Sequence, residues 1–291
     1  IGTSGILGVG IVLIGDTFEG AARTRAMGLN TGGLQLTAMM GPVLAGLLAA
    51  GGTFRPFLIF LIGIPLAAWA SRMPSDRPEV DVERPTRHLV ECVGMMRREK
   101  TLVDYLGILV ATFMAVYVLH GLGLTVTPLL LADEFDVGVS ARGFIIAMFQ
   151  LGTILVAFRI GVLLDRLGAH RLVTLAFVSM ALGAGFAALA PTALVVGLGL
   201  AIAGIGFGAF LPQAQSYAAS VGGVRYRGLT VLLWVSAIRV AQMAGPPTGS
   251  VVYDAIGPTV PFGVAAVVAG LIALCWIPLR RVLSSPVEVT G

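Results

Sequence analysis

Charge is scarce in this chain of 291 residues. Only 12% of the residues are Asp, Glu, Lys or Arg, about half the share that is usual in a soluble domain, whereas 57% are hydrophobic. The hydrophobic residues form runs of roughly 18 or more that are apolar on every face, and these indicate helices that cross a membrane. A β-barrel would instead need alternating segments of about ten residues. The sequence therefore predicts an all-α membrane protein.

Cysteine and lysine are rarer still. The two cysteines, Cys92 in a charged loop and Cys275 in the last apolar run, argue against a disulfide framework. Lys100 is the single lysine and belongs to no glycine-rich phosphate loop, so we expect no ATP-driven transport. No His-Glu pair has zinc spacing, and the basic residues are scattered without interleaved aromatics. We therefore expect no metal, no cofactor and no nucleic acid.

Carboxylates are missing from the middle of the apolar runs, and this bears on enzymatic function. An intramembrane aspartyl protease needs two carboxylates that face each other. The candidates, Asp16 and Asp254, are expected on opposite faces of the membrane, and Leu13 stands where the first glycine of the protease motif belongs. We predict that the chain is not an enzyme.

Nine apolar runs are long enough to be membrane spans. They cover residues 1–17, 27–50, 54–71, 103–131, 142–164, 171–190, 192–219, 228–253 and 259–279. The loops between consecutive spans lie alternately on the two sides of the membrane, and this places most of the 19 Lys and Arg residues on one side. By the positive-inside rule, we expect that side to be cytoplasmic. The acidic segment Asp133 to Asp136 then faces outward, and so does Ile1.

Three features of the first three spans recur in the last three at a nearly constant offset. The pairs are Arg23-x-Arg25 with Arg225-x-Arg227, Gly41-Pro42 with Gly245-Pro246, and Pro56-Phe57 with Pro261-Phe262. A steady offset across six spans indicates two six-span halves, so three spans are expected before Ile1. Residues 1–72 would be the last three helices of the first half, 73–102 a cytoplasmic linker, and 103–291 the complete second half.

The connection between the fifth and sixth of these spans has the most distinctive charge pattern. Its order is Gly161, Asp165-Arg166, Gly168 and then Arg171. This spacing resembles the cytoplasmic loop of the major facilitator superfamily of secondary transporters. The resemblance extends over essentially the whole chain and implies the fold of that family, with nine transmembrane helices present of an expected twelve.

The resemblance also implies that this loop is a cytoplasmic latch, which holds the two halves together in one state and releases them in the other. Asp165 would accept a hydrogen bond from Arg166 or from an arginine across the interface, and Gly161 would allow close approach. Asp16, Arg23 and Arg25 resemble residues at the end of the family's fourth helix and would join the same gate. The alternatives are a loop that only sets topology and an ordinary surface ion pair.

A second motif lies in the second span. Gly28, Gly41, Pro42 and Gly46 resemble the glycine-proline motif of the family's antiporters, although Thr37 and Ala45 replace two of its glycines. Gly245 and Pro246 repeat its centre in the eighth span. A bendable helix with a small-residue face suits rocking halves and favours export, whereas simple helix packing is the alternative.

Polar side chains within the spans are candidates for a substrate path, because a charge at the bilayer centre costs about 2.5–3.5 kcal/mol. Arg239 shares a helical face with Gln242 and is a candidate to bind an anion, to assist a proton relay or to bond a carbonyl. His120, on one stripe with Tyr117, is either a proton carrier or a structural histidine. The remaining candidates are Gln35, Gln150, Gln213 and Tyr217.

These features favour secondary active transport by alternating access. Proton-coupled efflux of a small drug-like or amphipathic molecule is the first hypothesis, and proton-coupled uptake of a small metabolite or organic anion is the alternative. An incomplete membrane protein that transports nothing is the alternative of another class. We expect a monomer that interacts with substrate, protons and the lipid bilayer, in multi-pass form in a prokaryotic plasma (inner) membrane.

Overall fold

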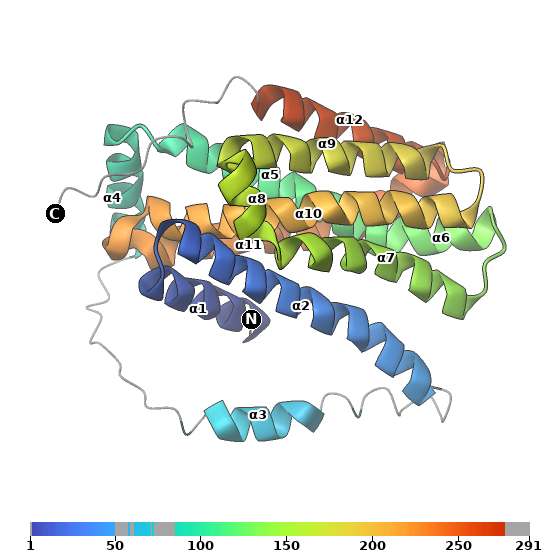
Figure 1. The fold of residues 1–291 in the computed structure, drawn as a ribbon, viewed down its shortest axis with the longest axis horizontal. Helices are drawn as coiled ribbons and strands as arrows, with labels where there is room; N and C mark the ends of the chain where they lie inside the picture. The colour runs from blue at the N-terminus through green and yellow to red at the C-terminus, as the bar shows by residue number, and fades with distance from the viewer. Residues whose placement is uncertain (1, 50–57, 59–60, 71, 73–84, 277–291) are drawn as a thin grey trace.

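A computed structural model describes residues 2–49, 58, 61–70, 72 and 85–276, and their regular structure is helical (Figure 1). The first segment holds α1 (Gly2–Thr17), α2 (Gly20–Ala49) and α3 (Gly63–Ala70), and α4 (Pro85–Arg98) follows it. The second segment holds α5 (Leu102–Val118), the π-helix η2 (Leu119–Val126), α6 (Thr127–Asp133), α7 (Val139–Ala157), α8 (Ile160–Leu167), α9 (Ala169–Ala188), α10 (Ala193–Val221), α11 (Gly223–Ile256) and α12 (Val260–Trp276).

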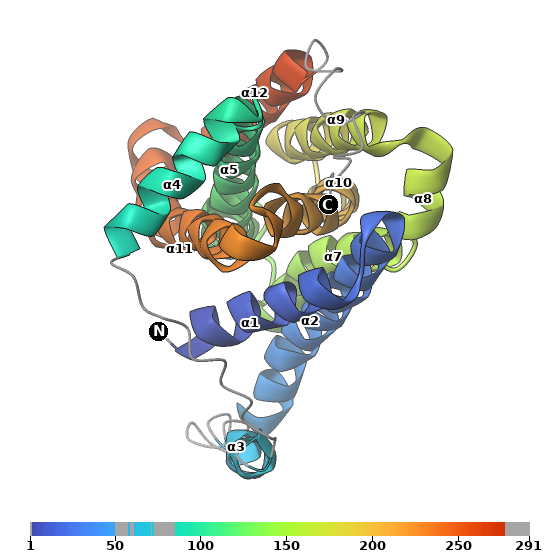
Figure 2. The ribbon, with the colours of Figure 1, turned by 90° about the vertical axis from the view of Figure 1, so that its left-hand side faces the viewer.

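Helix α10 lies at the centre of the bundle and contacts α2, α5, α7, α9 and α11 (Figure 2). Glycines let its neighbours approach at backbone distance. A Cβ atom placed on Gly204 would lie 2.1 Å from the carbonyl oxygen of Phe149 in α7, and one on Gly199 would lie 2.6 Å from that of Gly183 in α9. The small residues of α10 therefore pack helices, as expected where lipid removes most of the hydrophobic drive for association.

Four helical stretches are long and apolar enough to cross a membrane within the described residues. They are Leu102–Asp133, in which α5, η2 and α6 run on as one helix, and Ala169–Ala188, Ala193–Val221 and Gly223–Ile256. Helices α7 and α8 together make a fifth if their break, bent by 61°, lies within one span. The apolar helices Gly8–Thr17 and Val260–Trp276 are shorter. The total of nine spans stays a prediction.

The charged connection before α5 is not simply a loop. Its residues Pro85–Arg98 form α4, which lies across the end of the bundle (Figure 1). The expectation that Cys92 sits in a charged loop is wrong, because its side chain is fully buried in α4 and burial raises the pKa of its thiol. A short amphipathic helix packs its apolar face against the rest of the protein and exposes its charged face to solvent. A prediction based on the number of charged residues does not detect this arrangement.

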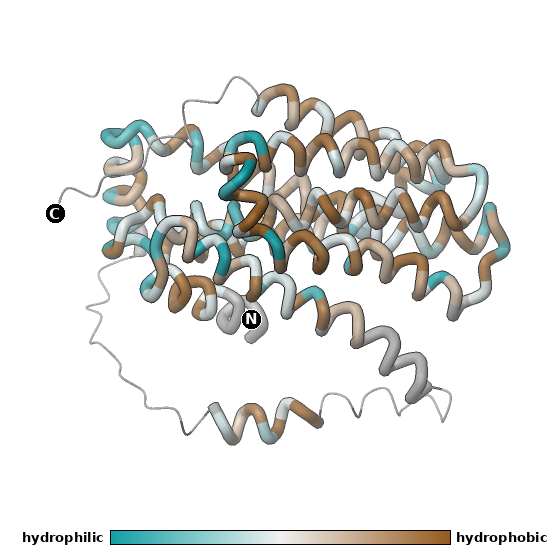
Figure 3. The backbone as a smooth tube through the Cα atoms, in the orientation of Figure 1, coloured by the Kyte–Doolittle hydropathy of each residue, from teal (hydrophilic) through white to brown (hydrophobic). Residues whose placement is uncertain are grey.

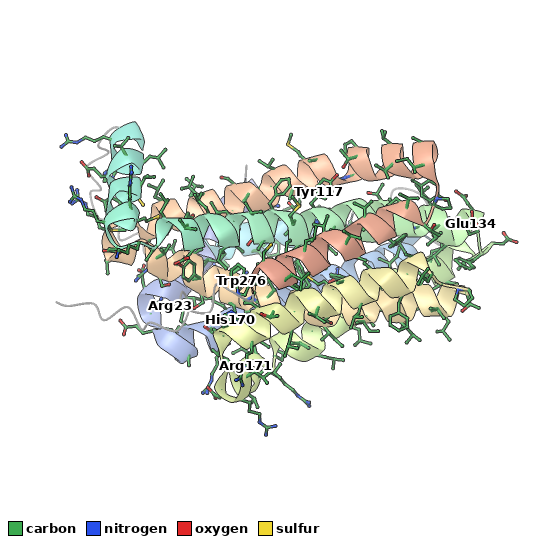
Figure 4. All side chains as sticks on the ribbon, turned by 90° about the horizontal axis from the view of Figure 1, so that it is seen from above. Arg23, Tyr117, Glu134, His170, Arg171 and Trp276 are labelled. Atoms are coloured by element: carbon green, nitrogen blue, oxygen red, sulfur yellow. The ribbon has the colours of Figure 1, made fainter. Side chains whose placement is uncertain are left out.

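Polar residues gather at the ends of the bundle and apolar residues cover its length (Figure 3). Arg23, His170 and Arg171 lie towards one end, and Glu134 lies at the other (Figure 4). These labelled residues lie at the ends that the topology predicted from the positive-inside rule gives them.

Candidate cytoplasmic gate and transport path

An ion pair joins the start of α2 to the end of α8. The guanidinium of Arg25 donates from Nη2 to Oδ2 of Asp165, and each side chain remains about half exposed. Gly161 makes room for this contact, because a Cβ atom there would lie 2.4 Å from Cγ of Arg25. The aliphatic stem of Arg25 thus crosses α8 directly over the glycine and carries the charge to Asp165.

A second ion pair joins α1 to α11 at the same end. Asp16 accepts from Nη1 of Arg227, whose Nε also donates to the carbonyl oxygen of Ala219 at 2.8 Å. Arg227 is buried, with 10% of its side chain exposed, whereas Asp16 is 52% exposed. The side chain of Arg227 passes over Gly15, just as that of Arg25 passes over Gly161. A Cβ atom on Gly15 would lie 3.0 Å from Cδ of Arg227.

Arg227 was not among the predicted gate residues, although the sequence holds a signal for it. It is the repeat counterpart of Arg25 in the pairs Arg23-x-Arg25 and Arg225-x-Arg227. Charge and spacing could not show which acid it meets, because that depends on how α1 and α11 pack.

The other predicted gate residues have different surroundings. Arg23 is buried and its Nε donates to the carbonyl oxygen of Phe18 at 2.8 Å, where it satisfies the C-terminal end of α1. Gly168 has a φ of +75°, which a glycine adopts without strain, and it forms the turn from α8 to α9. Arg166 and Arg171 are exposed, and the acid Asp165 pairs across the interface with Arg25.

One face of α2 continues the contact away from the ion pairs. Thr24 donates to Ser216 at 3.1 Å, and Thr31 donates to Gln215 at 3.2 Å, both on α10. Thr31 and Gln215 are each 1% exposed, so this polar contact is sealed from solvent. Further along the same face, Nε2 of Gln35 donates to Oε1 of Gln150 on α7 at 2.7 Å.

Between these contacts, α2 crosses the break between α7 and α8. A Cβ atom on Gly28 would lie 2.3 Å from Cγ2 of Ile160 and 2.5 Å from the carbonyl oxygen of Ala157. The predicted motif residue Gly28 is therefore a point of close approach between the two segments. The surroundings of Gly41, Pro42 and Gly46, in the same predicted motif, lie outside the described residues.

The repeat of that motif lies where α11 meets η2. A Cβ atom on Gly245 would lie 2.8 Å from the backbone nitrogen of Gly121, and Gly249 approaches the carbonyl of Gly121 similarly. Pro246 stands inside α11, which runs on from Gly223 to Ile256. These glycines hold α11 and η2 at backbone distance within the second segment.

The polar candidates on α5, η2 and α11 form two separate contacts. The hydroxyl of Tyr117 bonds that of Thr248, beside an apolar pocket of about 200 Å³ between α5, η2, α11 and α12. His120 in turn bonds Nε2 of Gln242 at 3.1 Å, while Oε1 of Gln242 accepts from Nη1 of Arg239 at 2.8 Å.

The remaining candidates lie on α10. Gln213 is buried and its Nε2 donates to the carbonyl oxygen of Ala209 on its own helix at 2.8 Å, and Tyr217 is half-buried one turn further on. The structure therefore brings together His120, Gln242 and Arg239, and separately Gln35 and Gln150. No cluster of His, Cys, Asp and Glu among the described residues could hold a metal ion.

Comparison with known proteins decides the family. A model of the Major Facilitator Superfamily matches residues 1–127 and 108–290. The chain belongs to this superfamily. No curated protein matches the chain.

The fold of this superfamily member is also similar to that of a solved structure. The crystal structure of the human organic anion transporter MFSD10 (TETRAN) is similar with a TM-score of 0.73 at 17% sequence identity. The match covers 91% of this chain and 66% of the human protein, so the chain spans just under two thirds of that relative. Membership supports membrane transport by a multi-pass protein, and the family is typically not enzymatic.

Proposed function

We propose that this chain carries out secondary active transport by alternating access, and that the two ion pairs form its cytoplasmic gate. The observation that supports this most is their common placement. Arg25–Asp165 and Asp16–Arg227 each join a helix of the first segment to a helix of the second, at one end of the bundle. Opening this end requires both pairs to break, so the described conformation is the one with the gate closed.

The first candidate cargo is a small amphipathic molecule exported in exchange for protons. The partial glycine-proline motif favours export, and the apolar pocket beside Tyr117 and Thr248 suits a hydrophobic group. Few fixed charges lie within the described spans, which agrees with a cargo that is not strongly charged.

The second candidate is an organic anion taken up with protons, and a specific observation favours it. Arg239 is a cation within a membrane-spanning helix, half-buried and hydrogen-bonded, where a charge is costly unless it has a role. The name of the similar human protein, an organic anion transporter, points in the same direction. We favour this candidate, since Arg239 supplies the group that would recognise the cargo.

The test uses the purified chain in proteoliposomes under an imposed pH gradient. Ethidium represents an amphipathic cargo and p-toluenesulfonate an organic anion. We expect the gradient to drive one of them, and Asp16→Asn to slow this movement because it weakens the gate. Glu134→Gln, an exposed acid at the opposite end, is the matched control and should leave the rate unchanged. If neither probe moves faster than in protein-free liposomes, the proposal is wrong.

A further inference from the structure

We propose that α4 lies in the membrane interface and binds anionic phospholipid headgroups with its exposed face. Arg97 and Arg98 supply the positive charge that meets the phosphates, and Val90 lies among the headgroups. The occupant of this face is the bilayer and not a second protein. The inference goes beyond the proposed transport, because it concerns the lipid around the chain and holds whatever the cargo is.

One face of α4 is already held by the protein, and this fixes which face points outward. Cys92 and Met96 on this face are fully buried. Beside them, Glu91 accepts hydrogen bonds from Nη2 of Arg225 and from the hydroxyl of Tyr226, both on α11 and each at 3.2 Å. These contacts hold α4 against rotation about its own axis, so the opposite face stays directed away from the bundle.

The outward face of α4 combines apolar and basic side chains. Leu89 and Val93 lie one helical turn apart and are both exposed, and Val90 beside them is 71% exposed. Arg97 and Arg98 are exposed at the end of the same helix. An apolar stripe bordered by arginines is typical of helices that lie in a membrane interface. There the apolar side chains reach the acyl boundary and the guanidinium groups meet the headgroups.

The position of α4 brings this face to the level of the headgroups. The helix lies across the end of the bundle, crosswise to the long helices (Figures 1 and 2). The backbone nitrogen of Thr101 donates to the carbonyl oxygen of Met96 at 2.9 Å, so the apolar stretch Leu102–Asp133 begins directly against the last turn of α4. Val103, at the start of that stretch, is exposed. The end of α4 therefore lies where hydrocarbon gives way to headgroups.

The charge of this segment is complementary to an anionic leaflet. Its cations outnumber its acids, and these are Arg87, Arg97, Arg98 and Lys100 against Glu91 and Glu99. Glu91 is engaged with Arg225 of α11, so the net charge that faces outward is positive. Each Lys or Arg near an anionic surface strengthens the attachment by about fivefold. The bilayer surrounds the bundle at this level, so the contact needs no further component.

The experiment measures how far lipid covers residue 90. The chain carries Val90→Cys in a background of Cys92→Ala and Cys275→Ala, with a nitroxide spin label on the new cysteine. It is placed in nanodiscs of phosphatidylcholine, with or without phosphatidylglycerol. Collision of the label with the neutral, water-soluble nickel complex NiEDDA reports its access to water. We expect phosphatidylglycerol to lower this access, and a rise from about 0.1 M to about 1 M salt to restore it, because salt screens the attraction.

Substitutions assign the effect to α4. Each of Arg97→Gln and Arg98→Gln should lower the ratio of protected to accessible label in phosphatidylglycerol by about fivefold. Arg97→Lys with Arg98→Lys, which keeps the charge, should keep the response. Arg166→Gln with Arg171→Gln is the matched control, because these exposed arginines belong to α8 and α9. Glycerol 1-phosphate, the headgroup chemistry without acyl chains, should not protect the label in phosphatidylcholine.

A second measurement shows whether α4 stays in place. In chains that retain Cys92, the variant Arg97→Gln with Arg98→Gln should leave the alkylation of this buried thiol by N-ethylmaleimide slow, because the opposite face of α4 holds the helix on the protein. Fast alkylation would overturn the assignment, since the arginines would then hold α4 to the bundle and not to lipid.

Three further results would overturn the proposal. They are equal access of the label in the two lipids, an unchanged response when both arginines are glutamine, and protection by glycerol 1-phosphate. Equal access would leave this face free for a soluble partner, and protection by the free headgroup would indicate a site for a soluble anion. No transport is measured, so a failure of the proposed function would leave these results standing.

Discussion

Removing the charge of Asp16 should open the cytoplasmic gate further than removing that of Asp165. The two carboxylates are exposed to the same degree, 52% and 51%, so their own solvation does not separate them. Their partners differ. The side chain of Arg25 is 56% exposed, whereas that of Arg227 is 10% exposed. Asp16 supplies the negative charge that faces this buried guanidinium, which also donates to the neutral carbonyl oxygen of Ala219.

These exposures set the expected magnitudes. An exposed ion pair contributes about 0–1 kcal/mol, so Asp165→Asn should shift the gate equilibrium by at most about fivefold. A hydrogen bond to a charged and buried group contributes about 1.5–3 kcal/mol, so Asp16→Asn should shift the equilibrium by about tenfold or more.

A cysteine at Ser216 reports the gate, because this side chain accepts a hydrogen bond from Thr24 at the interface of α2 and α10. Its alkylation by N-ethylmaleimide is followed in a background of Cys92→Ala and Cys275→Ala. Both gate variants should accelerate alkylation, Asp16→Asn more than Asp165→Asn, and Glu134→Gln should not. An equal or reversed order would refute the reasoning that the buried partner decides the strength of the gate.

Three further predictions concern helix packing and α4. Gly161→Ala should accelerate alkylation of the Ser216 reporter as Asp165→Asn does, without adding to it, because the new Cβ displaces Arg25 from the same contact. Gly204→Ala should destabilise the chain by about 1–3 kcal/mol in thermal unfolding, because the new Cβ meets the backbone of α7. Gly185→Ala is the control, because its Cβ would point into open space. Equal stability of the two variants would contradict this description of the packing. Arg87 holds the pKa of Glu91 below its usual value, and Tyr226 and Arg225 add to this effect. The ionised Glu91 also bonds Arg225 and Tyr226, and so links α4 to α11. We therefore expect this link to be present at neutral pH and to be lost as the pH falls through the lowered pKa of Glu91. At neutral pH, Glu91→Gln should expose Cys92 and accelerate its alkylation relative to Glu99→Gln, and an unchanged rate would show that Glu91 does not hold α4.

Much of the fold follows from apolar periodicity, because each lipid-facing span must satisfy its own backbone hydrogen bonds. The run predicted at 192–219 is α10, and the run at 103–131 is the continuous helix that ends at Asp133. The run predicted at 142–164 is broken between α7 and α8, where α2 crosses. Arg159, a charge inside the predicted span, lies at this break, but the crossing of α2 at the same point cannot be read from hydropathy.

The partners of the polar residues were harder to predict for the same reason. Sequence placed His120 and Arg239 on separate spans, and only the parallel packing of η2 against α11 brings both to Gln242. The sequence could not distinguish Arg166, the neighbour of Asp165 in the chain, from an arginine across the interface as the partner of Asp165. The choice of Arg25 is made by α2 crossing α8 over Gly161.

The two ion pairs of the proposed gate have the same construction, and this construction indicates what determines which residues pair. In each, an arginine from the first turns of a helix lays its stem over a glycine of the other segment and reaches an aspartate near it: Arg25 over Gly161, and Arg227 over Gly15. Charge alone would allow many pairings among the basic residues of this end, each weak in water. The glycine restricts the pairing, because only there can an arginine stem lie close enough to the opposite helix. We therefore expect closure of the proposed gate to depend on shape as much as on charge, with Gly161 and Gly15 contributing to it as well as the ion pairs.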